Sequence, residues 1–444
     1  MDSTQAKRTR RRNTVVATTD LYLPDECWEY SLRSSLAIYK FSKDYDTLSL
    51  ALSKLRKVDL TNHFFFYDKE LFHLFKNCKL LEEAIFFDCG ITDDGIASAL
   101  RERPTLKTLC FSNILKPEYS VTSNFSDSLS SLKSLTSLDL LSFNISNELL
   151  SSIAITRLPL RRLVLQDCMG YSYSGIFSLL SKCQHIQHLD LQNADFLNDQ
   201  HVAELSSFLG DLLSINISCC HKLTQSTLFA VTRNCPSLSE IKIESIGSEI
   251  VEKFDSFIDF GVHPQLKSLY LAHNLWLSDE SIVMFASTFP NLQLLDLKSC
   301  KNISEKGIGQ ILRRCFKIKH LNLNYCSRLK ILRMDFGVSK LEVLNVSNTR
   351  VDDEALYVIS KYCCGLLQLV LENCSDVTEK GVMHMVENLK QLREISFCNC
   401  FIMHSNVIVS MIFSRPSLRK INIPNYRLSD KERELLLHQG CYVW

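Results

Sequence analysis

The sequence predicts an α/β fold in the form of a solenoid, whose tandem units each supply one strand and one helix. Three observations predict it. A motif of three apolar residues recurs about fifteen times along the 444 residues, helix-start residues follow most copies of the motif, and glycine (13) and proline (9) are scarce. A repeat protein grows by adding units, so this length does not require several separate cores.

The recurring motif places an apolar residue, a second one three positions later and a third one two positions after that. The first copy is Leu55, Val58 and Leu60, and the last begins at Leu418, which gives a mean interval of about 26 residues. This interval lies in the leucine-rich-repeat range. The last two apolar residues have the spacing of strand residues that share one face. We therefore expect a right-handed solenoid with a parallel β-sheet on its concave face and helices on its convex face.

Residues that favour helix N-termini follow the motif, as Ser, Thr, Asn and Asp side chains can bond the free backbone donors of a first helical turn. They predict helices that begin at Thr92-Asp93-Asp94, Asn198-Asp199, Thr224, Ser278-Asp279-Glu280, Ser304-Glu305, Asp352-Asp353-Glu354 and Thr378-Glu379. The length of the repeat unit is irregular in three places: around Pro117, in residues 244–262 and in residues 329–339. The last of these units is too short for a full helix.

Twelve of the 18 cysteines occupy two fixed positions of the repeat. Eight residues after the first apolar residue stand Cys89, Cys168, Cys220, Cys300, Cys326, Cys374 and Cys400, and three residues before it stand Cys78, Cys183, Cys235, Cys315 and Cys363. Such periodic placement predicts reduced thiols that pack as small hydrophobes and donate to a backbone carbonyl at a turn. Cysteine pairs at metal-ligand spacing are missing from the sequence, so no metal and no cofactor is expected.

Composition limits the class of protein and of partner. The formal net charge is +1, with 46% hydrophobic and 22% charged residues, which is typical of a folded chain and predicts no nucleic-acid partner. Neither a membrane-spanning run nor a secretory signal is evident, so a cytoplasmic and/or nuclear location without membrane contact is expected. The basic run of residues 7–12 is compatible with a nuclear-import signal or with a solvated tail.

The sequence offers no catalytic constellation, and we expect a non-catalytic binding protein. Gly307-Ile308-Gly309 lacks the third glycine of a dinucleotide loop. Binding would use the variable strand residues that point to the concave face. The candidates for contact with a target protein are Arg162, His188, Asp190, Tyr270, Asp296, Lys298, His320 and Asn322. The alternative is a sheet face that is simply solvated.

The end of the repeat unit resembles one known class. Cys300-Lys301-Asn302-Ile303-Ser304 and Cys374-Ser375-Asp376-Val377-Thr378 are similar to the ending of the cysteine-containing leucine-rich repeat. The resemblance covers roughly residues 50–424. That class is best known from F-box proteins, the substrate receptors of Skp–cullin–F-box (SCF) ubiquitin ligases.

The segment before the repeats resembles the opening of an F-box, and plant F-box/leucine-rich-repeat proteins are the most similar. It reads Leu23-Pro24-Asp25-Glu26-Cys27-Trp28-Glu29. The resemblance implies that Leu23, Pro24, Glu26 and Trp28 bind a Skp-type adaptor, while a target on the concave face is presented for ubiquitin-dependent proteasomal degradation. The segment is shorter than the F-box of the family. A stand-alone interaction scaffold without a functional F-box is therefore the alternative.

These observations predict four regions. They are a disordered basic tail (1–20), a partial F-box-like or capping segment (21–48), the leucine-rich repeats (49–424) and a C-terminal capping helix with a tail (425–444). We expect the last region to seal the array through Leu435 to Leu437 and Trp444, because terminal repeats need a cover.

Overall fold

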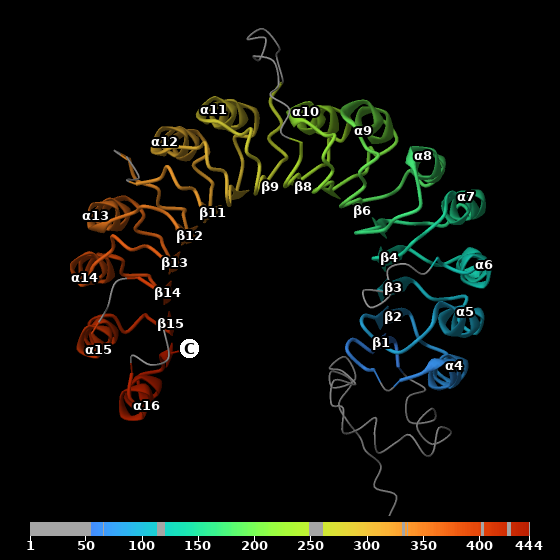
Figure 1. Cartoon of the computed structure of the whole chain (residues 1–444), viewed down its shortest axis with the longest axis horizontal. Helices are drawn as coiled ribbons and strands as arrows, with labels where there is room; N and C mark the ends of the chain where they lie inside the picture. The colour runs from blue at the N-terminus through green and yellow to red at the C-terminus, as the bar shows by residue number, and fades with distance from the viewer. Residues whose placement is uncertain are drawn as a thin grey trace, which may run out of the picture.

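The structure is a computed structural model of the whole chain, and Figure 1 shows it as an arch with strands inside and helices outside. It describes residues 55–64, 66–112, 120–247, 261–330, 334, 336–400, 404–423 and 428–443. The expected adaptor-binding residues Leu23, Pro24, Glu26 and Trp28 and the first two predicted regions lie outside these residues.

The strands form one sheet of 16 strands, in which each strand pairs in parallel with the next one along the chain. This is the arrangement that the repeat predicts, since every unit adds one strand in the same sense. The strands are β1 (Lys57–Asp59), β2 (Glu83–Phe86), β3 (Thr108–Ser112), β4 (Ser137–Leu141), β5 (Arg162–Val164), β6 (His188–Asp190), β7 (Ser214–Asn216), β8 (Glu240–Lys242), β9 (Ser268–Tyr270), β10 (Leu294–Asp296), β11 (His320–Asn322), β12 (Val343–Asn345), β13 (Gln368–Val370), β14 (Glu394–Ser396), β15 (Lys420–Asn422) and β16 (Tyr442–Val443).

The helices follow the strands and line the convex side (Figure 1). They are α4 (Asp68–Asn77), α5 (Asp93–Arg101), α6 (Ser123–Ser131), α7 (Asn147–Thr156), α8 (Tyr173–Leu180), α9 (Asp199–Ser206), α10 (Gln225–Asn234), α11 (Asp279–Thr288), α12 (Glu305–Arg314), α13 (Asp353–Tyr362), α14 (Glu379–Asn388), α15 (Ser405–Ser414) and α16 (Asp430–His438). The described residues between β11 and β12 contain no helix, as the short interval predicts.

The helix starts predicted from the sequence are confirmed. At each one the side chain before the helix accepts a hydrogen bond from a backbone N–H of the first turn, which satisfies one of the free donors there. These capping residues are Thr92, Asn198, Thr224, Ser278, Ser304, Asp352 and Thr378.

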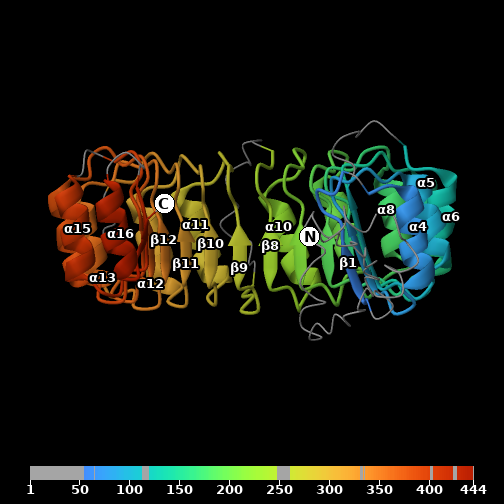
Figure 2. The same ribbon diagram turned by 90° about the horizontal axis from the view of Figure 1, so that it is seen from below.

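The apolar residues of the motif point into one continuous interior. Leu269 in β9 is fully buried, and its register partners Leu295 and Ile241 on the two neighbouring strands are buried as well. Each core side chain therefore packs against the preceding and the following unit, so that stability comes from neighbours rather than from one unit alone. Figure 2 looks into the arch and shows the strands lying side by side across its middle.

A left-handed turn follows each strand from β1 to β14 whose turn lies within the described residues; the turn after β3 lies outside them. The residue two positions after the third apolar residue has a positive φ, which redirects the chain from the sheet toward the helix. Asn, Asp and Ser, which tolerate this conformation better than bulky residues do, occupy most of these positions. The residues are Asn62, Asp88, Ser142, Asp167, Asn193, Cys219, Ser245, His273, Ser299, Tyr325, Asn348, Asn373 and Asn399.

The cysteine that follows this turn joins neighbouring units. The Cys300 thiol donates to the carbonyl of Leu271 in the preceding unit at 3.2 Å, and the Cys326 thiol donates to that of Leu297 at 3.2 Å. The predicted thiol–carbonyl contact is thus confirmed at six of these positions: Cys168, Cys220, Cys300, Cys326, Cys374 and Cys400. Asn274 stands at the same repeat position, and its Nδ2 donates to the carbonyls of Ile243 and Leu271.

A second link joins the helix starts of neighbouring units, and the sequence analysis missed it. Both carboxylate oxygens of Asp279 accept hydrogen bonds from Ser304, one from its backbone N–H at 2.8 Å and one from its hydroxyl at 2.6 Å. Gly307 lies beside this carboxylate, where a Cβ would come within 2.4 Å of Asp279 Oδ1. The same arrangement recurs with the pairs Asp68–Thr92 and Asp353–Thr378, next to Gly95 and Gly381.

The C-terminal end differs from the expectation in detail. Leu436 is fully buried, whereas Leu435 and Leu437 are 42% and 56% exposed, so the expected sealing by all three leucines is wrong. Only one of three consecutive helical residues can face the array, because successive residues of a helix point about 100° apart. β16 then extends the sheet by pairing in parallel with β15. Trp444 lies outside the described residues.

Candidate binding surface on the concave face

The concave face consists of the first and third residues of each short strand, since the middle residue is buried. In register, the first residues form one row of side chains across the sheet and the third residues form a second row. In the middle of the arch the first row is Arg162, His188, Ser214, Glu240, Ser268, Leu294 and His320, and the second row is Val164, Asp190, Asn216, Lys242, Tyr270, Asp296 and Asn322.

Three of the predicted target-binding residues meet in one pocket on this face. The pocket, of about 120 Å³, lies over β5 to β8 and includes the predicted residues Arg162, His188 and Asp190. Ser214 and Asn216 also line the pocket, although neither was predicted from the sequence. The complete lining is Arg162, Val164, His188, Leu189, Asp190, Ser214, Asn216, Glu240 and Lys242.

Arg162 is held at one end of the pocket by Asp139 of β4. Its Nε donates to both carboxylate oxygens of Asp139 at 3.0 and 3.1 Å, and its Nη2 donates to Oδ2 at 3.0 Å. The Asp139 side chain is 10% exposed, whereas that of Arg162 is 46% exposed. The guanidinium is therefore fixed on its inner side and still open to a ligand on its outer side.

Asp190 forms the floor of the pocket. Its Oδ1 accepts the backbone N–H of Gln192 at 3.0 Å, and its Oδ2 accepts Nδ2 of Asn216 at 2.8 Å. Burial raises the pKa of Asp190, and the two hydrogen bonds oppose this rise. The Asn216 amide also donates to Gln192 Oε1 at 3.2 Å. The Asn216 Oδ1 accepts the backbone N–H of Ser218 at 3.1 Å, so these bonds fix the orientation of both the carboxylate and the amide.

His188, Glu240 and Lys242 complete the pocket with groups of different charge. Burial lowers the pKa of His188, the nearby Arg162 lowers it further, and Glu240 opposes the shift, so the pocket favours the uncharged imidazole. Lys242 Nζ lies 3.6 Å from Glu240 Oε1 and 5.0 Å from the centre of the Tyr270 ring. The lysine thereby links the pocket to the strands that follow it.

The remaining predicted residues lie on β9 to β11 and the turn after β10. Asp296 accepts the backbone N–H of Lys298 at 2.8 Å and Nδ2 of Asn322 at 2.9 Å. Tyr270 is the register partner of Asp296, and His320 begins the next strand. The predicted contact residues therefore form two groups, one on β5 and β6 and one on β9 to β11 with the turn after β10, and only the first group shares a pocket.

The surface offers donors and acceptors suited to a polar or charged polypeptide. Its hydrogen-bonded carboxylates and amides alternate with cationic groups and one aromatic ring, so it can match polar groups and charges of either sign on a partner. Within the described ranges, no group of three His, Cys, Asp or Glu side chains is arranged to hold a metal ion. In the same part of the chain, no helix has the length and apolar character needed to cross a membrane.

This geometry defines the class of the protein. Units of about 26 residues build one parallel sheet, and helices cover the outside. A left-handed turn follows most strands, and after six of them a thiol donates to the preceding unit. The chain is therefore a leucine-rich-repeat solenoid of the cysteine-containing class.

Comparison with known proteins agrees, although no family model matches the chain. It is 27% identical over 129 residues to antagonist of mitotic exit network protein 1 of Eremothecium gossypii (28% of this chain, 33% of the relative). F-box/LRR-repeat protein 4 of Bos taurus is 26% identical over 164 residues (36% and 25%). GRR1-like protein 1 of Arabidopsis thaliana is 23% identical over 297 residues (57% and 49%). The chain is similar to these F-box/leucine-rich-repeat proteins, and it spans between a quarter and a half of their length.

Among solved structures, the chain resembles one from the complex of Rad7 and Elc1 in yeast. The TM-score is 0.48 at 14% identity, with 93% of this chain and 98% of that chain covered.

Proposed function

We propose that the protein is the substrate-recognition subunit of an SCF-type ubiquitin ligase, which holds a target protein on its concave face for ubiquitin-dependent degradation. The observation that carries the proposal is the pocket over β5 to β8, where fixed charged side chains are open to solvent on a rigid sheet. A site on rigid elements with preset hydrogen bonds loses little conformational entropy on binding. The F-box/leucine-rich-repeat relatives support the ligase context.

The pocket and the N-terminal segment would have separate tasks in this proposal. Arg162, Asp190 and Lys242 would contact the target, while Leu23 and Pro24 would contact the Skp-type adaptor. Because the repeats share one continuous core, a target on the arch would be held on a rigid scaffold. The protein itself would carry out no bond-making step.

Co-purification with a Skp-type adaptor tests the ligase context. The full chain is mixed with the adaptor at micromolar concentration and applied to a size-exclusion column, next to the Leu23→Ala/Pro24→Ala variant. Elution of wild-type chain and adaptor as one complex, lost in the variant, supports the proposal. Separate elution of the wild-type chain and the adaptor rejects it.

The second candidate is a stand-alone interaction scaffold. It is favoured by the short stretch of sequence between Leu23 and the first repeat, which is shorter than the F-box of the family. It would bind the same target through the same concave residues without an adaptor. The two candidates differ in one measurement, the turnover of the target in cells that express the Leu23→Ala/Pro24→Ala variant. Turnover slows if the chain acts through the ligase, and it is unchanged if the chain is a scaffold.

A further inference from the structure

The turns that follow β7 to β11 form a second surface at the edge of the sheet, which we name the central rim (residues 217–224, 243–247, 271–278, 297–304 and 323–330). Backbone hydrogen bonds hold these turns side by side. The N–H of His273 donates to the carbonyl of Lys298 at 2.7 Å, and that of Ser299 donates to the carbonyl of Asn324 at 2.7 Å. The central rim is therefore one continuous edge rather than a set of separate loops.

Charge is segregated along this edge. The central rim carries five Lys or Arg side chains and one carboxylate, that of the half-buried Glu244. The two turns before it (residues 166–172 and 192–198) carry two Asp and no Lys or Arg, and the two turns after it (346–352 and 371–378) carry three acids and one Arg. In a chain of net charge +1, this makes a local cationic patch between two acidic stretches. The cations are Lys222, Lys298, Lys301, Arg328 and Lys330.

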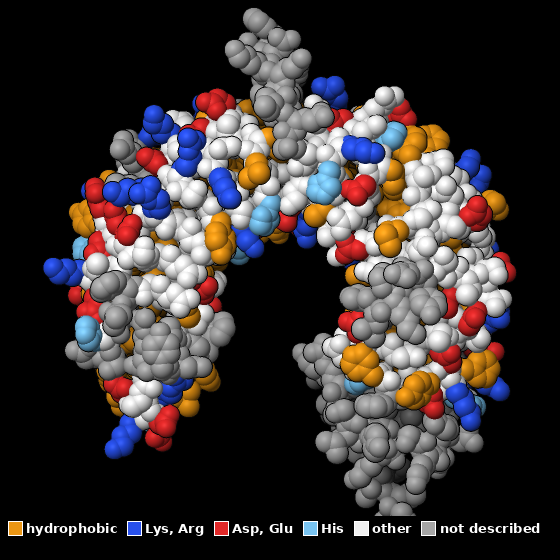
Figure 3. All heavy atoms as spheres, in the orientation of Figure 1, with side chains coloured by type: hydrophobic (Ala, Val, Ile, Leu, Met, Phe, Trp, Pro, Cys, Tyr) orange, Lys and Arg blue, Asp and Glu red, His pale blue; other side chains and the backbone are white. Residues whose placement is uncertain are grey.

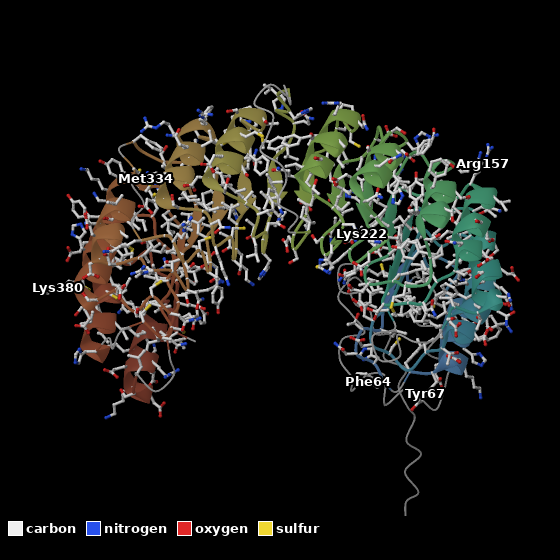
Figure 4. The ribbon with its side chains drawn as sticks, turned by 45° about the horizontal axis from the view of Figure 1, so that its top comes forward. Phe64, Tyr67, Arg157, Lys222, Met334 and Lys380 are labelled. Atoms are coloured by element: carbon white, nitrogen blue, oxygen red, sulfur yellow. The ribbon has the colours of Figure 1, made fainter. Side chains whose placement is uncertain are left out.

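Most of these cations are available to a partner. Lys222, Lys301 and Arg328 are exposed, and none of them forms an ion pair with a carboxylate of the described residues. Lys330, by contrast, lies 3.8 Å from Asp352. Figure 4 places Lys222 at the inner side of the arch, away from the outer helices where Lys380 lies. In Figure 3, Lys and Arg, histidine and hydrophobic side chains lie along the inner edge of the middle of the arch, together with some Asp and Glu side chains.

Tyr325 adds an aromatic group to the patch at a conformational cost. It has φ 61° at the left-handed turn position that most other repeats fill with Asn, Asp or Ser, as in Asn193 and Asn348, and the residue is 49% exposed. An aromatic residue in this conformation is disfavoured, and such strain is typical of functional positions. Leu275, 53% exposed on the same edge, is a second apolar group among the cations.

From this arrangement we infer that the central rim binds an acidic segment of the partner protein, with Tyr325 and Leu275 contacting apolar side chains between the acidic ones. The inference rests on the proposed function, because the segment would belong to the target held on the concave face. Five neighbouring turns, about 4.8 Å apart, span about 20 Å, which is the length of about six extended residues. A longer nucleic-acid strand would extend onto the acidic turns on either side, where carboxylates would repel its phosphates.

A labelled peptide tests the inference on the full chain. The probe is a fluorescein-tagged ten-residue peptide of Glu with two interspersed Phe, and the readout is fluorescence anisotropy in 50 mM salt. We expect Lys301→Glu/Arg328→Glu to weaken binding at least about tenfold, because two attractive charges become repulsive. The matched control Lys182→Glu/Lys380→Glu makes the same change of charge outside the central rim and should stay within about twofold of wild type.

Tyr325→Asn gives an independent readout. It removes the aromatic contact and replaces it with the residue that the left-handed turn favours, so peptide binding should weaken severalfold while the melting temperature stays equal or rises. Weaker binding together with a lower melting temperature would mean that Tyr325 serves packing and would overturn its assigned role.

Two results overturn the inference as a whole. One is equal peptide affinity of wild type and Lys301→Glu/Arg328→Glu, and the other is tighter, equally charge-dependent binding of a ten-nucleotide DNA strand. If the peptide fails to bind while pocket substitutions still abolish target capture, the rim inference fails and the proposed function stands. If pocket substitutions leave capture unchanged, the proposed function fails whatever the peptide does.

Discussion

Arg162 and Asp139 lie on neighbouring strands, and the arginine donates through Nε and Nη2 to both carboxylate oxygens of the aspartate. The pair couples the stability of the sheet to the shape of the pocket, because the carboxylate that holds the guanidinium is almost fully buried. Removing its charge should therefore loosen a residue that the ligand would contact.

We predict that Asp139→Asn lowers the free energy of unfolding by about 1 kcal/mol, because the bonds to the half-exposed guanidinium weaken. Urea unfolding followed by circular dichroism measures it. Lys420→Met, which breaks the exposed pair with Glu394 at 2.8 Å, is the control and should cost less than about 0.5 kcal/mol. Equal losses in the two variants would argue against a special role for the Asp139–Arg162 pair.

Gly307→Ala should destabilise the protein although alanine is the better helix former. A Cβ at this position would lie 2.4 Å from Asp279 Oδ1, so the link between Asp279 and Ser304 must shift. We expect a loss of about 1–3 kcal/mol by urea unfolding. Gly210→Ala is the matched control, since a Cβ there meets nothing within 4 Å. A Gly307→Ala variant as stable as the control would show that the aspartate moves aside freely.

The buried thiols predict a loss of stability at alkaline pH. Burial raises the pKa of Cys235 and Cys315 from 9.0 to about 12. In the unfolded chain these thiols lose their protons near pH 9, whereas the folded state keeps them up to about pH 12. The free energy of unfolding should thus be unaffected below about pH 8 and fall between pH 9 and pH 12, by up to about 1.4 kcal/mol per pH unit for each thiol.

Urea unfolding at pH 7.5, 9 and 10 checks this dependence. The variant Cys235→Ala/Cys315→Ala should be less stable at pH 7.5, because two buried side chains are shortened, but should lose less stability per pH unit above pH 9. A slope identical to that of wild type would mean that these thiols ionise equally in both states.

Leu269→Asp should unfold the units around β9. The side chain is fully buried between Leu295 and Ile241, and an unpaired carboxylate there costs several kcal/mol, which is about the stability of a small domain. Circular dichroism melting should show the loss of a large part of the native transition. Ser268→Asp, one residue earlier on the concave face, is the control and should keep the wild-type melting profile.

The sequence predicted the strands and their buried side chains because the apolar spacing dictates which side of a strand is covered. Leu269 and Leu295 share one motif position, and the sheet pairs them directly. The thiol contacts were predictable for the same reason, because a cysteine that recurs at one position of the repeat has the same neighbours in each unit. Capping residues such as Ser278 were found because their side-chain chemistry is local.

Features that depend on contacts between units were not predictable. The bond of Asp279 to Ser304 spans 25 residues, and neither residue looks unusual in its own unit. Asn216 reaches the pocket because β6, β7 and β8 align in register, which brings it to Asp190. β16 was missed because two residues, Tyr442 and Val443, show no period. The candidate residues of the concave face can therefore be predicted from the pattern of a single unit. The pocket cannot, because it forms only where neighbouring units stack.

The most direct test of the central claim is quantitative capture of partners from cell extract by the full chain and by its His188→Ala/Lys242→Ala variant, compared by mass spectrometry. The control is Lys182→Ala/Lys380→Ala, which changes exposed residues outside the concave face. Our account predicts that at least one captured protein is lost with the pocket variant, is kept by the control and accumulates in cells that lack the chain. The same partners in the same amounts on the pocket variant would contradict it.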